Sequence, residues 1–140
     1  MPALKLAAAL ALLSACAQNS DPVALPGTFT NVYTTLFPRA TKYQCEMCHG
    51  LPANDISNGL LAMGMDQATA YAALVGQQSA SSKCGGMDLV VAGDAEHSLM
   101  YLKLSPNPPC GDRMPLSGKT LSAAQLTMVR AWIDDGAADD

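Results

Sequence analysis

The sequence predicts a small all-α fold of about four short helices, and three observations lead to this prediction. Apolar residues recur at steps of three and four in separate segments, which is the period of one helix face. Residues that commonly start or stop helices bound these segments. A chain of 140 residues, 49% hydrophobic and 14% charged, is long enough for one globular domain and too short for two comfortable ones.

The first helix is expected from Thr28, before a Pro38 that would stop or kink it. Its apolar face comprises Phe29, Val32, Tyr33, Leu36 and Phe37. A second helix follows Asp66 as N-cap and ends at Gly76. Its apolar residues are Ala70, Tyr71, Leu74 and Val75.

A third helix is expected after Asp94, which is placed as its cap, and before the turn-rich segment 105–109. Its apolar residues are Leu99, Tyr101, Leu102 and Leu104. The last helix has the clearest signals, because Ser122 and Gln125 form a capping box. Leu121 and Leu126 stand where a hydrophobic staple needs them. The expected buried stripe is Leu126, Val129, Trp132 and Ile133, before Gly136.

The composition leaves this fold with a thin core of its own. The chain contains 9 Pro, 11 Gly and only 5% aromatic residues, so the connections between helices should be long and irregular. Short helices are marginal unless they pack against something. A large apolar cofactor at the centre would supply what the core lacks.

The N-terminal segment reads as a signal peptide over residues 1–15, because Lys5 precedes an apolar run too short to span a bilayer. Its end, LSAC, resembles the lipobox of bacterial lipoproteins, in which Cys16 would carry the lipid. An ordinary signal peptidase site within Ala15-Cys16-Ala17 is the alternative. Residues 16–27 then form a flexible tether, and the domain spans 28–138.

The net charge of −4 and the lack of a basic run argue against nucleic acid and against electrostatic docking on anionic lipid. An exported protein with a lipidated Cys16 would instead meet the membrane through its N-terminal lipid. In that compartment disulfides can persist.

The segment QCEMCHG carries the chemistry, because Cys45, Cys48 and His49 project from one face of a helical turn. Two thiols at this spacing can add to the two vinyl groups of one porphyrin while the adjacent imidazole reaches the iron. C-x-x-C-H is therefore typical of covalent haem attachment. The cofactor prediction is one covalent haem c, with the helices packed around it.

Two other sites can use the same cysteines. A thioredoxin-like dithiol expects a strand before the motif, where this chain has a helical pattern and Pro38. A zinc site would need four thiolates, from Cys45, Cys48, Cys84 and Cys110. If haem occupies the first two, Cys84 and Cys110 are left to form one disulfide, with free buried thiols as the alternative.

The iron would need a second axial ligand, and Met114 is the first candidate, because it stands in an irregular segment before the last helix and Pro115 fixes the backbone beside it. Met63, Met65, Met87 and Met100 are alternatives, and Met100 on a helix stripe more often packs in a core. His97 would give ligation by two histidines, although its polar surroundings favour an exposed or capping role.

Five stretches together resemble the monohaem class I cytochromes c, and in particular the short domains of this kind in bacterial lipoproteins: CEMCHG, AYAALVG, AGDAEHSLMYLKL, CGDRMPLSGKTLSAAQ and VRAWIDDGA. The resemblance covers Thr28 to Ala137. It implies an all-α fold whose first and last helices cross, thioether bonds at Cys45 and Cys48, and axial ligation by His49 and Met114.

The expected function is single-electron transfer by an exported, membrane-anchored carrier, on the periplasmic side of the envelope and attached to the outer membrane. Its partners would be redox proteins, the domain itself would be monomeric, and it would not be an enzyme. The alternatives are a five-coordinate haem sensor or peroxidase-like module, and a non-redox lipoprotein stapled by its disulfide.

Overall fold

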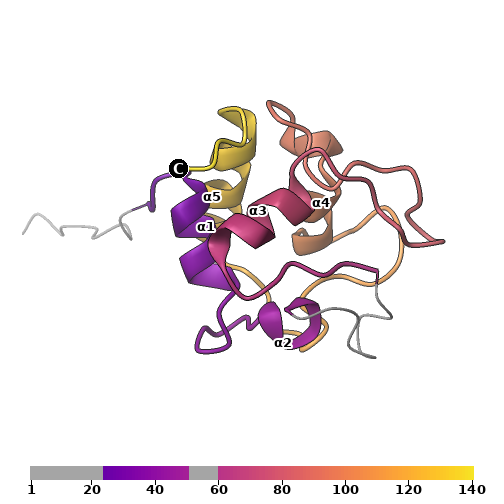
Figure 1. The fold of residues 1–140 in the computed structure, drawn as a ribbon, viewed down its shortest axis with the longest axis horizontal. Coiled ribbons are helices and arrows are strands. Elements are labelled where there is room, and N and C mark those ends of the chain that lie inside the picture. The colour runs from indigo at the N-terminus through magenta and orange to yellow at the C-terminus, as the bar shows by residue number, and fades with distance from the viewer. Residues whose placement is uncertain (1–23, 51–59) are drawn as a thin grey trace, which may run out of the picture.

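The computed structural model describes residues 24–50 and 60–140, and these residues form a helical fold without a sheet (Figure 1). In chain order the elements are α1 (Phe29–Leu36), α2 (Glu46–His49), α3 (Gln67–Leu74), the 3₁₀ helix η1 (Ala95–His97), α4 (Leu99–Leu104) and α5 (Ala123–Asp134). Within these two ranges, β-structure is limited to three isolated bridges. The prediction of an all-α class is confirmed at this level. No helix in the described part of the chain is long and apolar enough to cross a membrane.

The core lies where α1 packs against α5 and α3 (Figure 1). Phe29 is fully buried on α1, and its ring centroid lies 4.9 Å from that of Trp132 on α5 and 5.3 Å from that of Tyr71 on α3. Such aromatic pairs stabilise a fold beyond the area that they bury. The first and last helices of the domain are therefore joined at their apolar faces.

The helices α1 and α3 begin and end close to where the sequence predicts. Thr28 caps α1 by accepting a hydrogen bond from the N–H of Asn31 at 3.2 Å, and the helix ends one residue before its C-cap Phe37, which Pro38 follows. Asp66 caps α3 by accepting from the N–H of Thr69 at 2.9 Å. Short polar caps and a proline are local signals, so they could be read without knowing the tertiary structure.

The helix predicted between Asp94 and segment 105–109 is present as α4, but the prediction that Asp94 caps it is wrong. Asp94 accepts the N–H of His97 at 3.1 Å and caps only the 3₁₀ helix η1. The backbone at Ser98 is then extended, because its buried hydroxyl accepts the N–H of Val91 at 2.8 Å and donates to the carbonyl of Asp94 at 2.8 Å. This side chain to backbone bonding interrupts the helix, and α4 starts only at Leu99.

The predicted capping box of α5 is confirmed, since Ser122 accepts from the N–H of Gln125 at 3.3 Å and Gln125 accepts from the N–H of Ser122 at 2.9 Å. The buried stripe is slightly different from the prediction. Val129, Trp132 and Ile133 are buried, Met128 is buried as well, and Leu126 is only partly buried.

Residues just outside the range 28–138 contact α1. The carbonyl of Pro26 accepts from the side-chain amide of Asn31 at 3.0 Å. At the other end, the side chain of Asp140 accepts the N–H of Phe29 at 2.8 Å and its carbonyl accepts the N–H of Thr30 at 2.9 Å. The C-terminal residue thus satisfies two free donors at the start of α1. The predicted signal peptide and Cys16 lie outside the described residues.

Replacing Ser122 with Ala should lower the free energy of unfolding by about 1 kcal/mol, because the N–H of Gln125 at the start of α5 loses the hydroxyl that accepts its hydrogen bond. Urea unfolding followed by circular dichroism measures this change. Thr120→Ala, at an exposed position outside the capping box, is the control and should leave the midpoint almost unchanged. Equal shifts in both variants would contradict the capping role.

Candidate functional site

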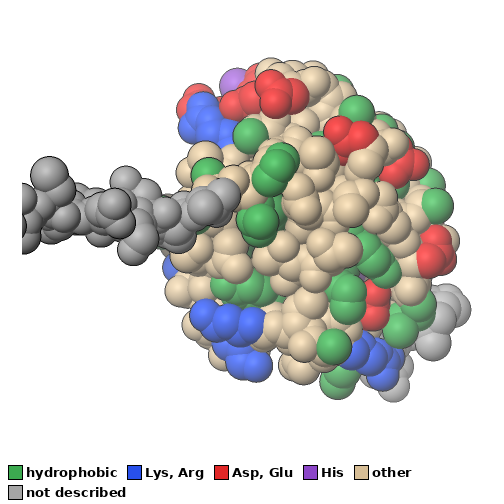
Figure 2. Space-filling model, turned by 90° about the vertical axis from the view of Figure 1, so that its left-hand side faces the viewer, with side chains coloured by type: hydrophobic (Ala, Val, Ile, Leu, Met, Phe, Trp, Pro, Cys, Tyr) green, Lys and Arg blue, Asp and Glu red, His purple; other side chains and the backbone are tan. Residues whose placement is uncertain are grey.

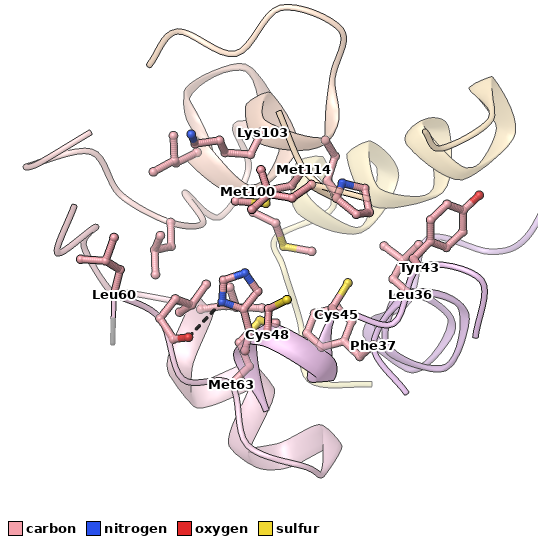
Figure 3. A pocket seen from close by; sticks show the side chains of 18 of the residues that line it. Leu36, Phe37, Tyr43, Cys45, Cys48, Leu60, Met63, Met100, Lys103 and Met114 are labelled. Atoms are coloured by element: carbon pink, nitrogen blue, oxygen red, sulfur yellow. Dashed lines mark hydrogen bonds between the residues drawn. The ribbon is translucent and has the colours of Figure 1, made fainter. Parts of the chain in front are cut away.

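A cavity of about 390 Å³ collects most of the residues that the sequence singles out (Figure 3). Its size falls within the range of roughly 300 to 1,000 Å³ that small-molecule and cofactor sites occupy. One side is formed by residues 45–49 and 60–63, which we call the His49 side. The other side, called the Met114 side, is formed by residues of α4 and of segment 112–117. Most of the lining side chains are apolar, including Leu36, Phe37, Leu74, Leu89, Leu99 and Leu104.

The helical turn α2 places Cys45, Cys48 and His49 together on the cavity. It is fixed to the end of α1, because the N–H of Cys45 donates to the carbonyl of Leu36 at 3.3 Å and that of Glu46 to Phe37 at 3.0 Å. These two carbonyls belong to the last turn of α1, which has no further helical partners for them. The end of one helix therefore positions the start of the next.

Glu46 is the one charged side chain of α2 that is buried, with only 5% of its surface exposed. The hydroxyl of Tyr33 on α1 donates to its carboxylate at 2.9 Å. Burial and this carboxylate raise the pKa of Tyr33 to about 12. The tyrosine stays protonated at neutral pH and can hold α2 against α1.

The imidazole of His49 is oriented by the backbone that follows it. Its Nδ1 lies 3.0 Å from the carbonyl oxygen of Leu61, which is the dashed line in Figure 3. A carbonyl can only accept, so Nδ1 carries the hydrogen and Nε2 has the lone pair that a metal can use. The N–H of Met63 also donates to the carbonyl of His49 at 2.6 Å. Fixing the tautomer in this way is what a metal-binding histidine requires.

Sequence reasoning missed the role of Leu61, and no local signal could have revealed it. The accepting group is a backbone carbonyl, which every residue has, and it lies 12 residues after His49. Only the return of the chain to α2 gives this carbonyl its function.

The cysteines of α2 are free thiols that lie partly buried on the cavity. Burial raises the pKa of the Cys45 thiol to about 12, and the nearby Cys48 and Glu46 contribute to the rise. A redox-active dithiol needs the opposite, a thiol whose pKa lies below its ordinary value. The environment of Cys45 therefore argues against the thioredoxin-like alternative.

Cys84 and Cys110 form a disulfide, as the sequence predicted, with their Cα atoms 5.6 Å apart. This bond excludes the alternative of free buried thiols. It also takes two of the four thiolates that the zinc alternative needs. Within residues 24–50 and 60–140, no group of three or more His, Cys, Asp or Glu side chains is placed to hold a metal ion.

Met114 lies on the cavity, across from Cys45 and Cys48 (Figure 3). Its N–H donates to the carbonyl of Lys103 at 2.8 Å, which links segment 112–117 to α4. The ammonium of the same Lys103 donates to the carbonyls of Cys110 at 2.6 Å and Asp112 at 3.0 Å. One lysine thus fixes the loop before Met114 at three points, and the disulfide fixes it at Cys110.

The structure sorts the other candidate axial ligands. Met100 lies on the cavity, and Figure 3 shows it on the same side as Met114, so its interpretation as core packing alone is incomplete. Met63 also lines the cavity, but on the His49 side. Met65 is 41% exposed, and Met87 has its sulfur 3.8 Å from that of Cys110. The cavity lining includes neither of these two.

His97 has the exposed role that the sequence favoured. Its side chain is 79% exposed and its Nδ1 lies 2.6 Å from the carboxylate of Asp94. It is not part of the cavity lining, so the structure does not bring the two histidines together.

The arrangement brings an imidazole and two thiols to one side of an apolar cavity and two thioethers to the other. Comparison with known proteins adds no relative to this description, because no protein family model, curated protein or solved structure matches the chain.

The raised pKa of Cys45 predicts how this thiol reacts with an alkylating reagent. In a Cys16→Ser/Cys48→Ser variant, Cys45 is the one free thiol while the Cys84–Cys110 disulfide is intact. Only the thiolate attacks iodoacetamide, so a pKa near 12 keeps the rate low at neutral pH. The rate should still rise about tenfold per pH unit above pH 9, where an ordinary cysteine levels off.

Mass spectrometry of the alkylated peptide follows this rate. The free thiol of a short peptide containing Cys45 is the control and should level off near its ordinary pKa, about 8.5. A plateau at that same pH in the folded protein would contradict the buried environment of Cys45.

Proposed function

We propose that this protein is a membrane-anchored c-type cytochrome that transfers single electrons through one covalently bound haem. The observation that carries the proposal is the cavity with Cys45, Cys48 and His49 on one side and Met114 on the other. When bound, a haem with two axial ligands supplies a reversible Fe(II)/Fe(III) couple and no open coordination site.

The residues of the cavity fit a haem in four respects. Two thiols from one helical turn suit covalent attachment, and the imidazole between Leu61 and the cavity is held in the tautomer that binds a metal through Nε2. A thioether across the cavity suits the second axial position. The apolar lining would exclude water from the porphyrin and lower the local dielectric, which tunes the reduction potential.

Each residue would have a separate task in this proposal. Cys45 and Cys48 hold the group to α2 through thioether bonds, so the neutral thiol of Cys45 is consumed by the attachment. His49 and Met114, both on the cavity, would hold the iron. Leu61 and Lys103 are positioning residues, because the carbonyl of Leu61 orients the imidazole and Lys103 fixes the loop before Met114.

The resemblance to class I cytochromes c belongs to the same proposal. The contact between the first and last helices and the short helical turn within C-x-x-C-H support this part of the proposal. The anchor would be a lipid on Cys16 after removal of residues 1–15, with the domain in the periplasm at the outer membrane. Its partners would be redox proteins.

Expression with a cytochrome c maturation system tests the attachment. Haem should remain on the protein through acid-acetone extraction and through denaturing electrophoresis, because thioether bonds survive both. Cys45→Ser/Cys48→Ser should lose the covalent haem, whereas Cys84→Ser/Cys110→Ser should retain it. Extraction of all haem from the wild-type protein would contradict the proposal.

Replacing Met114 with Ala should abolish the weak far-red absorption band of the oxidised protein and lower its reduction potential, since a thioether favours Fe(II). Met100→Ala is the matched control, because Met100 lies on the same side of the cavity. It should keep the band. If Met100→Ala abolishes the band and Met114→Ala does not, the axial ligand is Met100, and ready carbon monoxide binding by the wild type would favour a five-coordinate sensor.

A further inference from the structure

A second, more polar cavity of about 300 Å³ adjoins the first. The two share five lining residues, Leu60, Ser81, Lys103, Asp112 and Met114. The second cavity adds Ser82, Lys83 and Gly111, so two lysines and two serines surround it. Figure 3 shows Lys103 and Leu60 at one end of the main cavity, away from Tyr43 and Cys45. We call this region the lysine end.

The two lysines converge on Gly111. A Cβ atom at this glycine would lie 2.8 Å from Nζ of Lys103 and 3.8 Å from Cδ of Lys83, and its φ of 57° is one that glycine adopts without strain. A side chain at position 111 would therefore displace the Lys103 ammonium, while the stem of Lys83 lies at ordinary contact distance from the same point.

The ion pairs found in the described part of the chain involve His97 and Arg130, and neither lysine takes part in one. Lys103 uses two of its three N–H donors on backbone carbonyls, which leaves it a third donor and its full charge. Lys83 is exposed. The neighbouring Asp112 carboxylate offsets one positive charge, so the three side chains together keep a net charge of +1.

We propose that Lys83 and Lys103, with Ser81 and Ser82, bind the carboxylate groups of the haem. This inference rests on the proposed function and deepens it. The vinyl-bearing edge of the porphyrin is fixed at Cys45 and Cys48 by attachment, so its two carboxylates must reach another part of the cavity rim. A carboxylate against apolar side chains is costly unless a cation and hydrogen-bond donors compensate it. The lysine end supplies both.

The disulfide gains a function from this placement. Lys83 directly precedes Cys84, and the carbonyl of Cys110 accepts from Lys103 at 2.6 Å. The bond between Cys84 and Cys110 therefore holds the segments that carry both lysines next to each other. It joins the anion site to the loop of Met114, so one crosslink supports two parts of the haem environment.

The test compares three single-charge variants of the mature holoprotein. Lys83→Met removes a cation at the lysine end, and Asp112→Asn removes an anion there. Lys42→Met is the matched control, since Lys42 is an exposed lysine whose Nζ lies 5.3 Å from the ring centroid of Tyr43, at the other end of the cavity. Lys103 is left intact because it also positions Met114. The readouts are the reduction potential and the infrared bands of haem labelled with ¹³C at its carboxylates.

Lys83→Met should lower the reduction potential, because losing a cation favours Fe(III), and should shift the labelled carboxylate bands. Asp112→Asn should raise the potential. Lys42→Met should leave the carboxylate bands unchanged and should lower the reduction potential less than Lys83→Met does. The inference is overturned if Lys83→Met and Lys42→Met change the reduction potential equally. It is also overturned if Lys83→Met leaves the carboxylate bands unchanged.

These outcomes are separate from those that test the proposed function. If the protein has covalent haem and an intact far-red band, but Lys83→Met leaves the carboxylate bands unchanged, only the proposed anion site is contradicted. If the wild-type protein has no covalent haem, the proposed function and the anion site are both contradicted.

Discussion

Phe29 on α1 packs against Trp132 on α5 with ring centroids 4.9 Å apart, and the position of the whole His49 side depends on this contact. It fixes α1, whose last carbonyls at Leu36 and Phe37 accept the first N–H groups of α2. It also fixes α5, where Gln125 accepts the hydroxyl of Tyr43 at 2.5 Å, next to the same turn. The contact between α1 and α5 thus helps to position Cys45, Cys48 and His49 on the cavity, although neither α5 nor Phe29 lines it.

The Met114 side is stabilised differently, because it contains one six-residue helix and mostly irregular chain. Its links are covalent and polar: the disulfide, the bonds of Lys103 to the loop, and a bond from Arg113 to the carbonyl of Leu104 at 3.3 Å. A crosslink over a loop of this length contributes about 3 to 4 kcal/mol in the loop-entropy model. Each hydrogen bond contributes roughly 0.5 to 1.5 kcal/mol. Such links can position a loop where few apolar side chains are present to pack.

The features that the sequence predicted correctly depend on short-range signals. The start of the first helix near Thr28, the caps at Asp66 and Ser122, and the pairing of the two cysteines outside C-x-x-C-H follow from residue types and spacing. The features it missed depend on contacts between distant segments. Ser98 ends η1 because of where Val91 lies, Leu61 orients His49 through a backbone atom, and Asp140 caps α1 from the far end of the chain. Met100 has a helical spacing that suits a core and a cavity equally well, so periodicity could not distinguish them.

The buried core and the cavity share part of their lining. Leu36, Phe37 and Leu74 belong to the buried core and also line the cavity, so the core continues into the cavity wall. A planar apolar group that fills this space would remove lining surface from water. This burial contributes a stabilising free energy of about 25 cal/mol for each Å² of apolar surface. Short helices such as α3 and α4 gain most from that burial, because they are marginal without packing. If such a group binds the folded chain and not the unfolded one, its binding would raise the stability of the domain. Attachment to α2, which the α1–α5 crossing already positions, would then stabilise the Met114 side through the same molecule.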